Sequence, residues 1–403
     1  MDGGGGGDGG GARTEWVRRR NTATVLRALR TGGAASRAEL AQRTGLAKAT
    51  VGTIVASLEA GGALVEEPSR GGARGRPGRP VALVGDRYVA LGLELNVDYV
   101  AAVVLDLAGA VVRHETRPVE GDGDGALASL TALVSDTARR IGENRDRELV
   151  GAVVAVPGLV RSDDRTVAWA PNVDIDGERV VAGVERALGG GCPVEVSNDA
   201  DCAAYAEAYH GAATDTTSLL YLTGTVGVGA GIIEAGTLVR GAEGFAGEVG
   251  HMPVGDPTVP CGCGRTGCWE ASIGLHAMLR AVGMAELGTP LASAEAVAVR
   301  ARTDELMRRR LARVGSDVGL GLAVLAQVLD PAVVVLGGYF VPLGDLILDP
   351  ARRTLDERLL GPARGPELRL GALGIEAAAL GAAEQVFSDV FSGARKLPVP
   401  AAP

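Results

Sequence analysis

Four residues with metal-binding side chains lie within one short stretch of the chain. His251 is followed by Cys261, Cys263 and Cys268 in the pattern His-x9-Cys-x-Cys-x4-Cys. Thiolates and imidazoles are donors that zinc prefers, and structural zinc sites are closed by four protein ligands. The intervening glycines permit tight turns through which three sulfur atoms can meet. The stretch predicts a structural Zn²⁺ site; the alternative is a set of small buried cysteines without a metal.

Two carboxylates flank this predicted metal site. His251 belongs to the segment Glu248-Val-Gly-His251, and Glu270 follows the last cysteine. A metal site between two carboxylates is typical of the floor of a ligand site, because a bound metal can orient the histidine ring.

A second polar pair, Asn198-Asp199, lies between an apolar strand (194–197) and a helical segment. An amide and a carboxylate at a strand end can together bind two adjacent hydroxyl groups. Asp199 could also act as a general base toward a hydroxyl nucleophile. The simplest alternative is that the pair only caps the helix.

Composition sets the limits for these interpretations. The 403 residues are enough for two or three domains, and aromatic residues make up only 3%, so the core must be aliphatic. No run of about 18 uncharged apolar residues predicts a membrane span. Residues 1–13 lack the regions of a signal peptide, and we expect this segment and 393–403 to be disordered tails. Cysteines at metal spacing fit a reducing cytoplasm.

Charge divides the chain into two parts. Residues 13–80 hold 13 Lys and Arg against 5 Asp and Glu, whereas the remainder holds 27 against 44. A basic head on an acidic body indicates that the head meets a polyanion and the body does not.

The head, residues 14–85, has the pattern of a winged helix-turn-helix. Apolar spacing predicts a helix over 15–30, and a capping box, Ser36-x-x-Glu39, opens a second helix. A turn at Gly45 leads to a third helix over 47–60. Ala47 stands where a Ser or Thr cap is expected, and this absence costs about 1 kcal/mol.

Candidate DNA contacts lie on the third helix and on a wing loop over 69–80, between strands 64–67 and 81–84. Small or hydrogen-bonding side chains suit a helix that enters the major groove, and arginines on a Gly/Pro frame suit phosphates or the minor groove. A protein-interaction module and a solvated linker are the alternatives. The predicted contacts are Lys48, Ala49, Thr50, Thr53, Arg74, Arg76 and Arg79.

The body, residues 86–392, alternates strands and helices, which predicts an α/β fold with ligand sites at strand ends. The helices are expected over 125–141 and about 293–329. The strands are expected over 89–97, 100–107, 149–156, 194–197, 219–223, 229–233 and 333–336.

These motifs together resemble the ROK family of repressors, open reading frames and sugar kinases. The resemblance rests on Glu-x-Gly-His, the Cys-x-Cys-Gly-x-x-Gly-Cys-x-Glu segment and the strand-end Asn-Asp. It implies that the body is a two-lobed, actin-like domain of the sugar-kinase, RNase H-like ATPase type. It further implies that sugar hydroxyls are held by Gly158, Asn172, Asn198, Asp199, Glu248, His251 and Glu270.

The chain departs from the family's kinases in both phosphate loops. Where the kinases carry Asp-x-Gly-Gly-Thr-Lys, this chain reads Glu94-Leu-Asn-Val-Asp-Tyr99, with a carboxylate near the triphosphate position. The second loop, Gly-Thr-Gly, aligns with Thr225-Val-Gly227. Gly227, Gly229 and Gly231 alone are weak evidence of a phosphate loop and can mark a tight strand pair.

The sequence therefore predicts a cytoplasmic, sugar-responsive transcriptional regulator without phosphotransferase activity, with repression as the expected mode of regulation. The expected partners are a DNA operator and a monosaccharide such as xylose, glucose or N-acetylglucosamine, in a homodimer or homotetramer with no membrane association. One rival is an ATP-dependent sugar kinase with a DNA-binding head, in which Asp199 is the base. Another is a regulator that senses a partner protein.

Overall fold

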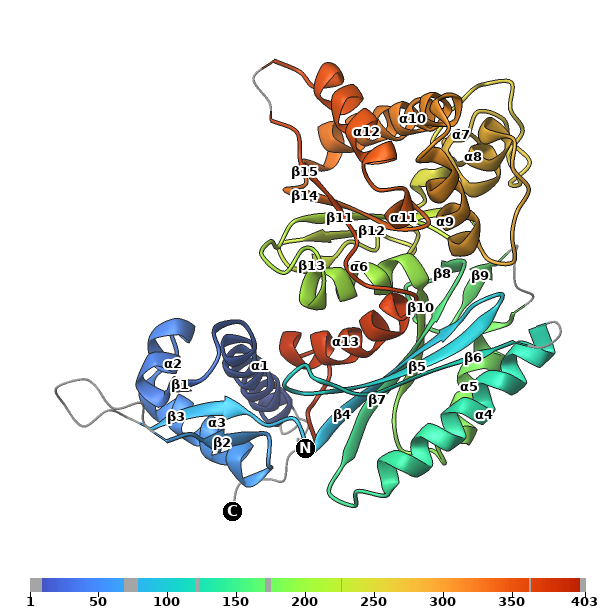
Figure 1. The fold of residues 1–403 in the computed structure, drawn as a ribbon. Coiled ribbons are helices and arrows are strands. Elements are labelled where there is room, and N and C mark those ends of the chain that lie inside the picture. The colour runs from blue at the N-terminus through green and yellow to red at the C-terminus, as the bar shows by residue number, and fades with distance from the viewer. Residues whose placement is uncertain are drawn as a thin grey trace, which may run out of the picture.

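The computed structural model describes residues 9–68, 79–119, 123–170, 175–225, 227–361 and 364–398. A small N-terminal head lies beside a body of two lobes, each built on a five-stranded sheet (Figure 1).

The head contains three helices and a small antiparallel sheet of order β1-β3-β2. The expected capping box forms, since the Ser36 hydroxyl accepts from the Glu39 amide and the Glu39 carboxylate accepts from the Ser36 amide. Gly45 ends the second helix with a positive φ of 71°, and Ala47 gives no side-chain cap. The elements are α1 (Gly9–Gly32), β1 (Ala35–Ser36), α2 (Arg37–Thr44), α3 (Lys48–Ala60), β2 (Leu64–Glu66) and β3 (Pro80–Leu83).

The first lobe carries a sheet of order β10-β7-β4-β5-β6, and α4 and α5 cover one of its faces (Figure 1). Alternate valines and leucines of β4 and β7 pack against Leu130 and Val180 of these two helices. The elements are β4 (Tyr88–Leu95), β5 (Tyr99–Asp106), β6 (Val111–Pro118), α4 (Gly123–Gly142), β7 (Glu148–Val156), α5 (Gly177–Ala187) and β10 (Val194–Asn198), with a hairpin of β8 (Leu159–Val160) and β9 (Val167–Trp169).

The second lobe repeats this arrangement with a sheet of order β13-β12-β11-β14-β15. In both sheets a central strand pairs with an antiparallel hairpin partner on one side and a parallel strand on the other. The strands are β11 (Leu219–Gly224), β12 (Val228–Glu234), β13 (Thr237–Leu238), β14 (Val333–Gly338) and β15 (Glu367–Leu370). The helices are η1 (Val249–His251), α7 (Glu270–Ile273), α8 (Leu275–Val282), α9 (Pro290–Ala301), α10 (Glu305–Leu329), α11 (Phe340–Leu343) and α12 (Asp345–Arg358).

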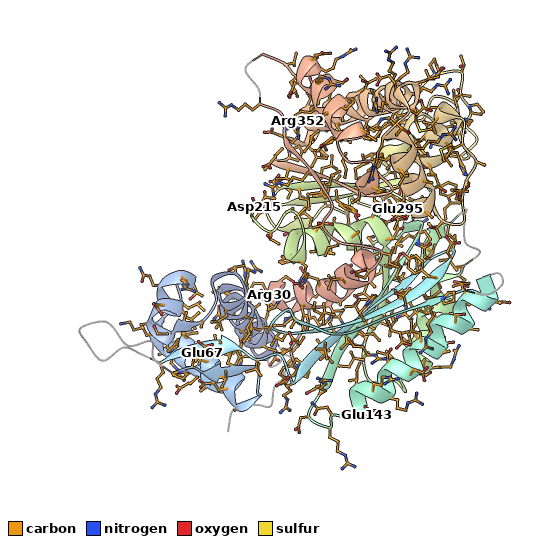
Figure 2. All side chains as sticks on the ribbon, viewed as in Figure 1. Arg30, Glu67, Glu143, Asp215, Glu295 and Arg352 are labelled. Carbon is orange, nitrogen blue, oxygen red and sulfur yellow. The ribbon has the colours of Figure 1, made fainter. Side chains whose placement is uncertain are left out.

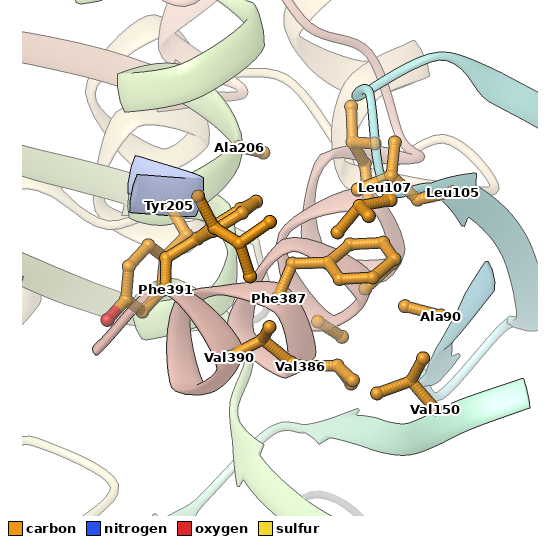
Figure 3. Packing of buried hydrophobic residues seen from close by; sticks show 14 of the residues in the cluster. Ala90, Leu105, Leu107, Val150, Tyr205, Ala206, Val386, Phe387, Val390 and Phe391 are labelled. Atoms are coloured by element: carbon orange, nitrogen blue, oxygen red, sulfur yellow. The ribbon is translucent and has the colours of Figure 1, made fainter. Parts of the chain in front are cut away.

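Two helices, α6 (Asp199–His210) and α13 (Ala377–Ser392), lie between the sheets (Figure 1). The α13 side chains Val386 and Phe387 pack against β4, β5 and β7, and Phe391 packs near Tyr205 of α6 (Figure 3). A Cβ at Gly381 would lie 1.6 Å from the carbonyl oxygen of Cys202, so this close helix contact requires glycine. The α13 helix therefore connects the two lobes, and it also contacts α1 of the head.

Among the described helices, α10 is long and apolar enough to cross a membrane. It packs along α12, and Leu311, Val318 and Leu322 are buried in the core of the second lobe. The helix is thus accounted for as a core helix.

Both chain ends differ in part from the disordered tails expected from sequence. The α1 helix begins at Gly9, inside the N-terminal segment 1–13. Residues 393–398 pack on the body and head: Leu397 is 4% exposed, Arg395 pairs with Glu195 at 2.7 Å, and Lys396 pairs with Glu15 at 3.0 Å. These contacts could not be predicted from the Pro/Ala composition, because they join residues far apart in sequence.

Candidate functional site

The four predicted metal ligands converge in the second lobe. One ligand atom from His251 and the three sulfur atoms all lie within 4.8 Å of one another. Cys261 Sγ lies 3.8 Å from His251 Nδ1, and Cys263 Sγ lies 3.6 Å from Cys268 Sγ. Zn–S bonds of about 2.3 Å in a tetrahedron place ligand atoms about 3.8 Å apart. The donor set and its spacing therefore fit a tetrahedral zinc ion.

Local turns and charges favour this arrangement. Gly264 and Gly267 have positive φ values of 85° and 75°, which side chains rarely adopt. Arg265 beside Cys263 lowers the pKa of that thiol to about 7, which favours the thiolate that a metal binds.

The metal cluster is joined directly to the flanking carboxylate at the start of α7. Glu270 Oε1 accepts a hydrogen bond from the Cys261 thiol at 3.7 Å, and Oε2 accepts one from the Val228 amide at 2.8 Å. His251 ends η1, the turn that begins after Glu248, and its Nδ1 points to the cysteines.

Asn198 and Asp199 lie at the end of β10 and the start of α6. The Asn198 Oδ1 atom accepts from the amides of Ala200 (2.9 Å) and Asp201 (3.1 Å), so this residue is indeed a helix cap. Its Nδ2 donates to the Gly158 carbonyl at 2.9 Å and holds the loop after β7. The Asp199 Oδ1 atom accepts from the Ala200 amide at 2.9 Å, and this carboxylate contributes less to capping α6 than the Asn198 side chain does.

Carboxylates gather at this point, and their pKa values reflect it. Burial raises the pKa of Asp199 to about 6. Burial also raises the pKa of Glu248, with His251 opposing and Asp199 and Glu270 adding to the shift. The Glu248 carboxylate is only partly desolvated, since the residue as a whole keeps an exposed surface, so water moderates this shift. The influence of the Asp199 and Glu270 charges on the Glu248 pKa indicates that the three carboxylates are neighbours.

Sequence reasoning missed Asp201, two residues further into α6. Its side chain is 3% exposed, and burial raises its pKa to about 8, assisted by Asp199 and Glu248 and opposed by Arg240. A second acid behind Asp199 is unusual because buried charges are unfavourable without a partner.

Sequence reasoning also missed Trp169, at the end of β9. Its side chain is 42% exposed, and its ring centre lies 6.3 Å from that of His251 at a tilt of 56°. A Cβ at Gly158 would lie 2.5 Å from the Trp169 carbonyl oxygen, so the glycine lets the hairpin approach this loop. The indole belongs to the first lobe and faces a histidine of the second. Asn172, three residues further on, lies outside the described residues.

The stretch that replaces the first phosphate loop is occupied by its own hydrogen bonds. The Tyr99 hydroxyl donates to Glu94 Oε1 at 2.6 Å, and Asn96 Nδ2 donates to the same oxygen at 3.1 Å. Burial raises the pKa of Glu94 to about 7. These contacts engage Tyr99, the residue expected from sequence to replace the lysine of the family's kinases.

The remaining glycines of the nucleotide side have packing roles within the described chain. A Cβ at Gly231 would lie 2.5 Å from Ala204 Cβ, where β12 crosses α6. A Cβ at Gly337 would lie 2.1 Å from the Tyr221 hydroxyl, and Gly338 has a φ of 59° with the Gly224 carbonyl oxygen alongside. A role in tight packing, the alternative to a phosphate loop, therefore accounts for these glycines.

The predicted DNA-contact residues of α3 lie on an accessible surface of the head. Lys48, Ala49 and Thr53 are exposed, and Thr50 is half-buried toward α1. Gly52, which sequence reasoning omitted, has open space where a Cβ would stand, so the α3 surface is open at this position.

The wing is described only at its base. Arg79 is 72% exposed at the start of β3 and pairs with Glu66 at 3.2 Å. Arg74 and Arg76 fall outside the described residues.

The comparisons with known proteins agree with this geometry. Residues 90–388 match the ROK family model. The chain belongs to the ROK family. Residues 19–75 match the MarR family model, which accounts for the winged helix-turn-helix head. This member therefore joins a ROK body to a DNA-binding type of domain.

Relatives of two kinds are similar to this ROK protein. The Bacillus subtilis xylose repressor is 27% identical, covering 91% of this chain and 94% of its own length. The Streptomyces coelicolor glucokinase is 29% identical and covers 73% of this chain and 96% of its own length. A ROK family transcriptional regulator, a homologue of the Escherichia coli Mlc protein, shares the fold over 94% of this chain and 98% of its own, with a TM-score of 0.79 and 23% identity. The match to the xylose repressor is long enough to include the head as well as the body. The match to the glucokinase is about as long as the body alone.

Proposed function

We propose that this ROK protein is a cytoplasmic, sugar-responsive transcriptional repressor. The proposal rests on two features found together. The head exposes a helix of the kind that reads DNA, and the body keeps the residues expected to bind sugar while its phosphate loops are replaced. Relatives named xylose repressor, similar over nearly the whole chain, support the same assignment.

The monosaccharide is proposed to bind between the lobes at the Asp199 carboxylate. Asp199 and Glu248 accept from sugar hydroxyls, and His251 Nε2 and Glu270 complete the polar set. Asn198 acts mainly through Gly158, whose loop it fastens at 2.9 Å. Asn172 remains a proposed contact by resemblance.

We propose Trp169 as an apolar wall of the same site. Sugar rings present C–H groups on one face, and an exposed indole beside the polar groups offers a stacking surface for that face. Because Trp169 and His251 belong to different lobes, a sugar between them would favour the closed arrangement of the lobes.

Zinc is proposed as the structural cofactor at His251, Cys261, Cys263 and Cys268. A bound zinc ion would hold the imidazole in one tautomer and orientation. Glu270, whose Oε2 accepts from the Val228 amide at 2.8 Å, follows Cys268 by two residues, so a metal held by the cysteines would also restrain this carboxylate. The proposed metal thus makes the sugar-contacting segment rigid.

Phosphotransfer is proposed to be lost. Tyr99 and Asn96 satisfy one oxygen of Glu94, and Asp98 lies exposed beside them as an unfavourable charge for a triphosphate. A coupled ADP-release assay with MgATP and a sugar panel should give no sugar-dependent rate, and turnover above background would establish the kinase alternative.

The head is proposed to bind an operator through α3 and the wing. Lys48 and Arg79 neutralise phosphates, while Ala49, Thr50 and Thr53 face base edges. Arg74 and Arg76 are proposed to contact the backbone or the minor groove. Two heads in a homodimer or homotetramer would then read two half-sites.

A buried ion-pair network is proposed to couple the sugar site to the head. Arg30 of α1 donates at 2.8 Å to Glu384 of α13, a carboxylate that is fully buried and also contacts His210 at 2.9 Å. Arg27 donates to the Phe391 carbonyl at 2.8 Å. Figure 2 places Arg30 where α1 faces α13. The other end of α13 begins near the cleft, so a movement of the lobes would reach the head through this helix.

The coupling role can be separated from a role in folding. Arg30→Ala leaves Glu384 without its main partner and should reduce sugar-dependent release of DNA at least fivefold while sugar affinity stays unchanged. Arg43→Ala, an exposed change on α2 of the head, is the control. Equal sugar response in both variants would remove this route.

The proposed function is tested by fluorescence anisotropy on DNA from upstream of the protein's own gene. Tight, salt-sensitive binding that one sugar reverses is the expected result. Binding that no sugar alters would favour a regulator that senses a partner protein, and absence of specific binding would contradict the proposal.

A further inference from the structure

A cavity of about 650 Å³ lies beside the proposed sugar site, on the side of the cleft where the family's kinases hold nucleotide. It is enclosed by residues from both lobes: the end of β4, the starts of α6, α9 and α13, and the turn after β14. Its volume is within the range of small-molecule sites. Asp199 lines this cavity as well, so the two sites share one carboxylate.

The ionisable acids and bases that line this cavity are all acidic among the described residues. The described lining residues include the carboxylates Glu94, Asp98, Asp199 and Glu295 and no Lys, Arg or His. Glu295 lies on α9 of the second lobe (Figure 2). A phosphate entering here would meet these carboxylates without a counter-charge, which is unfavourable.

One of these carboxylates is both buried and incompletely satisfied. Glu94 is 3% exposed, and while Oε1 accepts from Tyr99 and Asn96, Oε2 has no hydrogen-bond partner. The backbone amide of Ala379, at the start of α13, lowers the pKa of Glu94, but it does not have the geometry of a hydrogen bond to Oε2. A buried acceptor without a donor is unfavourable, because it has lost its hydrogen bonds to water without gaining others.

The rest of the lining is largely apolar. An ammonium group offers three donors and a positive charge, which match an unpaired carboxylate, and its carbon framework can cover apolar walls. These walls are formed by Pro290, Leu291, Val341, Pro342, Leu373 and Ile375.

From the shared position of the cavity, its acidic lining and the unpaired Glu94 oxygen, we propose a second effector site for a small organic amine. The ammonium group binds among the carboxyl groups of Glu94, Asp98 and Glu295, and the hydrocarbon part packs against the Pro, Leu, Val and Ile side chains. Because Asp199 borders both sites, the amine changes the affinity for sugar, and sugar changes the affinity for the amine by the same factor.

The test uses the full-length protein and a matched pair of probes, 2-phenylethylamine and the uncharged 2-phenylethanol, with MgATP as a third ligand. Calorimetric titration should show binding of the amine at least tenfold tighter than that of the alcohol, and no binding of MgATP. Glu94→Gln should weaken amine binding at least tenfold, and Glu234→Gln, an exposed change on β12 outside the cavity, should leave it unchanged.

Three outcomes would overturn the proposal: equal binding of amine and alcohol, tighter binding of MgATP, or amine binding that Glu94→Gln does not affect. Absence of amine binding across butylamine, hexylamine and 2-phenylethylamine would overturn it as well. If Glu94→Gln does not fold, Glu295→Gln at the exposed α9 position serves instead, with a loss of about threefold expected. Amine binding is measured without sugar or DNA, so its result is independent of the repressor proposal.

Discussion

The two halves of the interlobe cleft differ in what they preserve. On the side of the metal cluster, Asp199, Glu248, His251 and Glu270 remain together, and Glu270 is tied to Cys261 by a hydrogen bond. On the side where the family's kinases hold nucleotide, Tyr99 and Asn96 donate hydrogen bonds to Glu94. The glycines on this side, Gly231, Gly337 and Gly338, allow close packing of the backbone. A domain that binds a ligand without transforming it needs only the first half. The difference supports the proposal that this ROK body binds sugar without phosphoryl transfer.

Of the changes predicted here, loss of the metal should have the largest effect on the sugar-binding half of the cleft. Cys268→Ser replaces a buried sulfur ligand, and zinc content should fall from one per chain to near zero, with a melting temperature lower by about 5 °C or more. Sugar response should disappear with it, because His251 loses its fixed orientation. Elemental analysis and calorimetry measure the two effects.

The control for the metal variant is Cys192→Ser, which changes a half-buried cysteine far from the cluster in sequence and should leave zinc content unchanged. Full sugar affinity in zinc-free Cys268→Ser protein would show that the polar set does not depend on the metal.

The buried acid Asp201 gives the next largest effect, on stability rather than binding. Because burial raises its pKa in the folded state to about 8, the protonated form is favoured by folding. Its contribution is complete below the unfolded pKa near 4 and is lost as pH rises toward 8, by up to roughly 4 kcal/mol between pH 4 and pH 7.

Asp201→Asn should therefore make the free energy of unfolding less dependent on pH over this range and raise it at pH 7. Urea unfolding at pH 5, 6 and 7 measures the slope for both proteins. Parallel pH profiles for wild type and variant would mean that Arg240 neutralises the ionised Asp201 side chain.

Asp199→Asn directly tests the half of the cleft that is proposed to bind sugar. The change keeps the shape of the side chain but removes a charged acceptor for sugar hydroxyls, so sugar affinity should fall on the order of 100-fold. DNA affinity without sugar should be unchanged. Titration calorimetry and anisotropy on the same preparation separate the two, and an unaltered sugar affinity would place the sugar elsewhere.

Sequence patterns predicted the parts of this molecule that are local. The Ser36–Glu39 capping box, the His/Cys spacing and most body strands depend on residues close in the chain, and these form as expected. The pattern did not reveal α13, whose many alanines have no clear polar face because both sides of the helix are buried. Nor did it reveal β6 or the packed segment 393–398, which rely on partners distant in sequence.

Trp169 belongs to this second class, since only the fold brings it beside His251, and it gives the smallest predicted effect. Trp169→Ala removes a stacking surface worth about 1 kcal/mol, so sugar affinity should fall roughly fivefold to tenfold. Trp169→Phe keeps an aromatic face and should recover part of the loss. Trp16 lies in the head, and Trp269 is buried between Cys268 and Glu270, so a sugar-induced change in tryptophan fluorescence should become smaller in Trp169→Phe. Unchanged sugar affinity in Trp169→Ala would mean that the sugar reaches the polar half of the cleft without the indole.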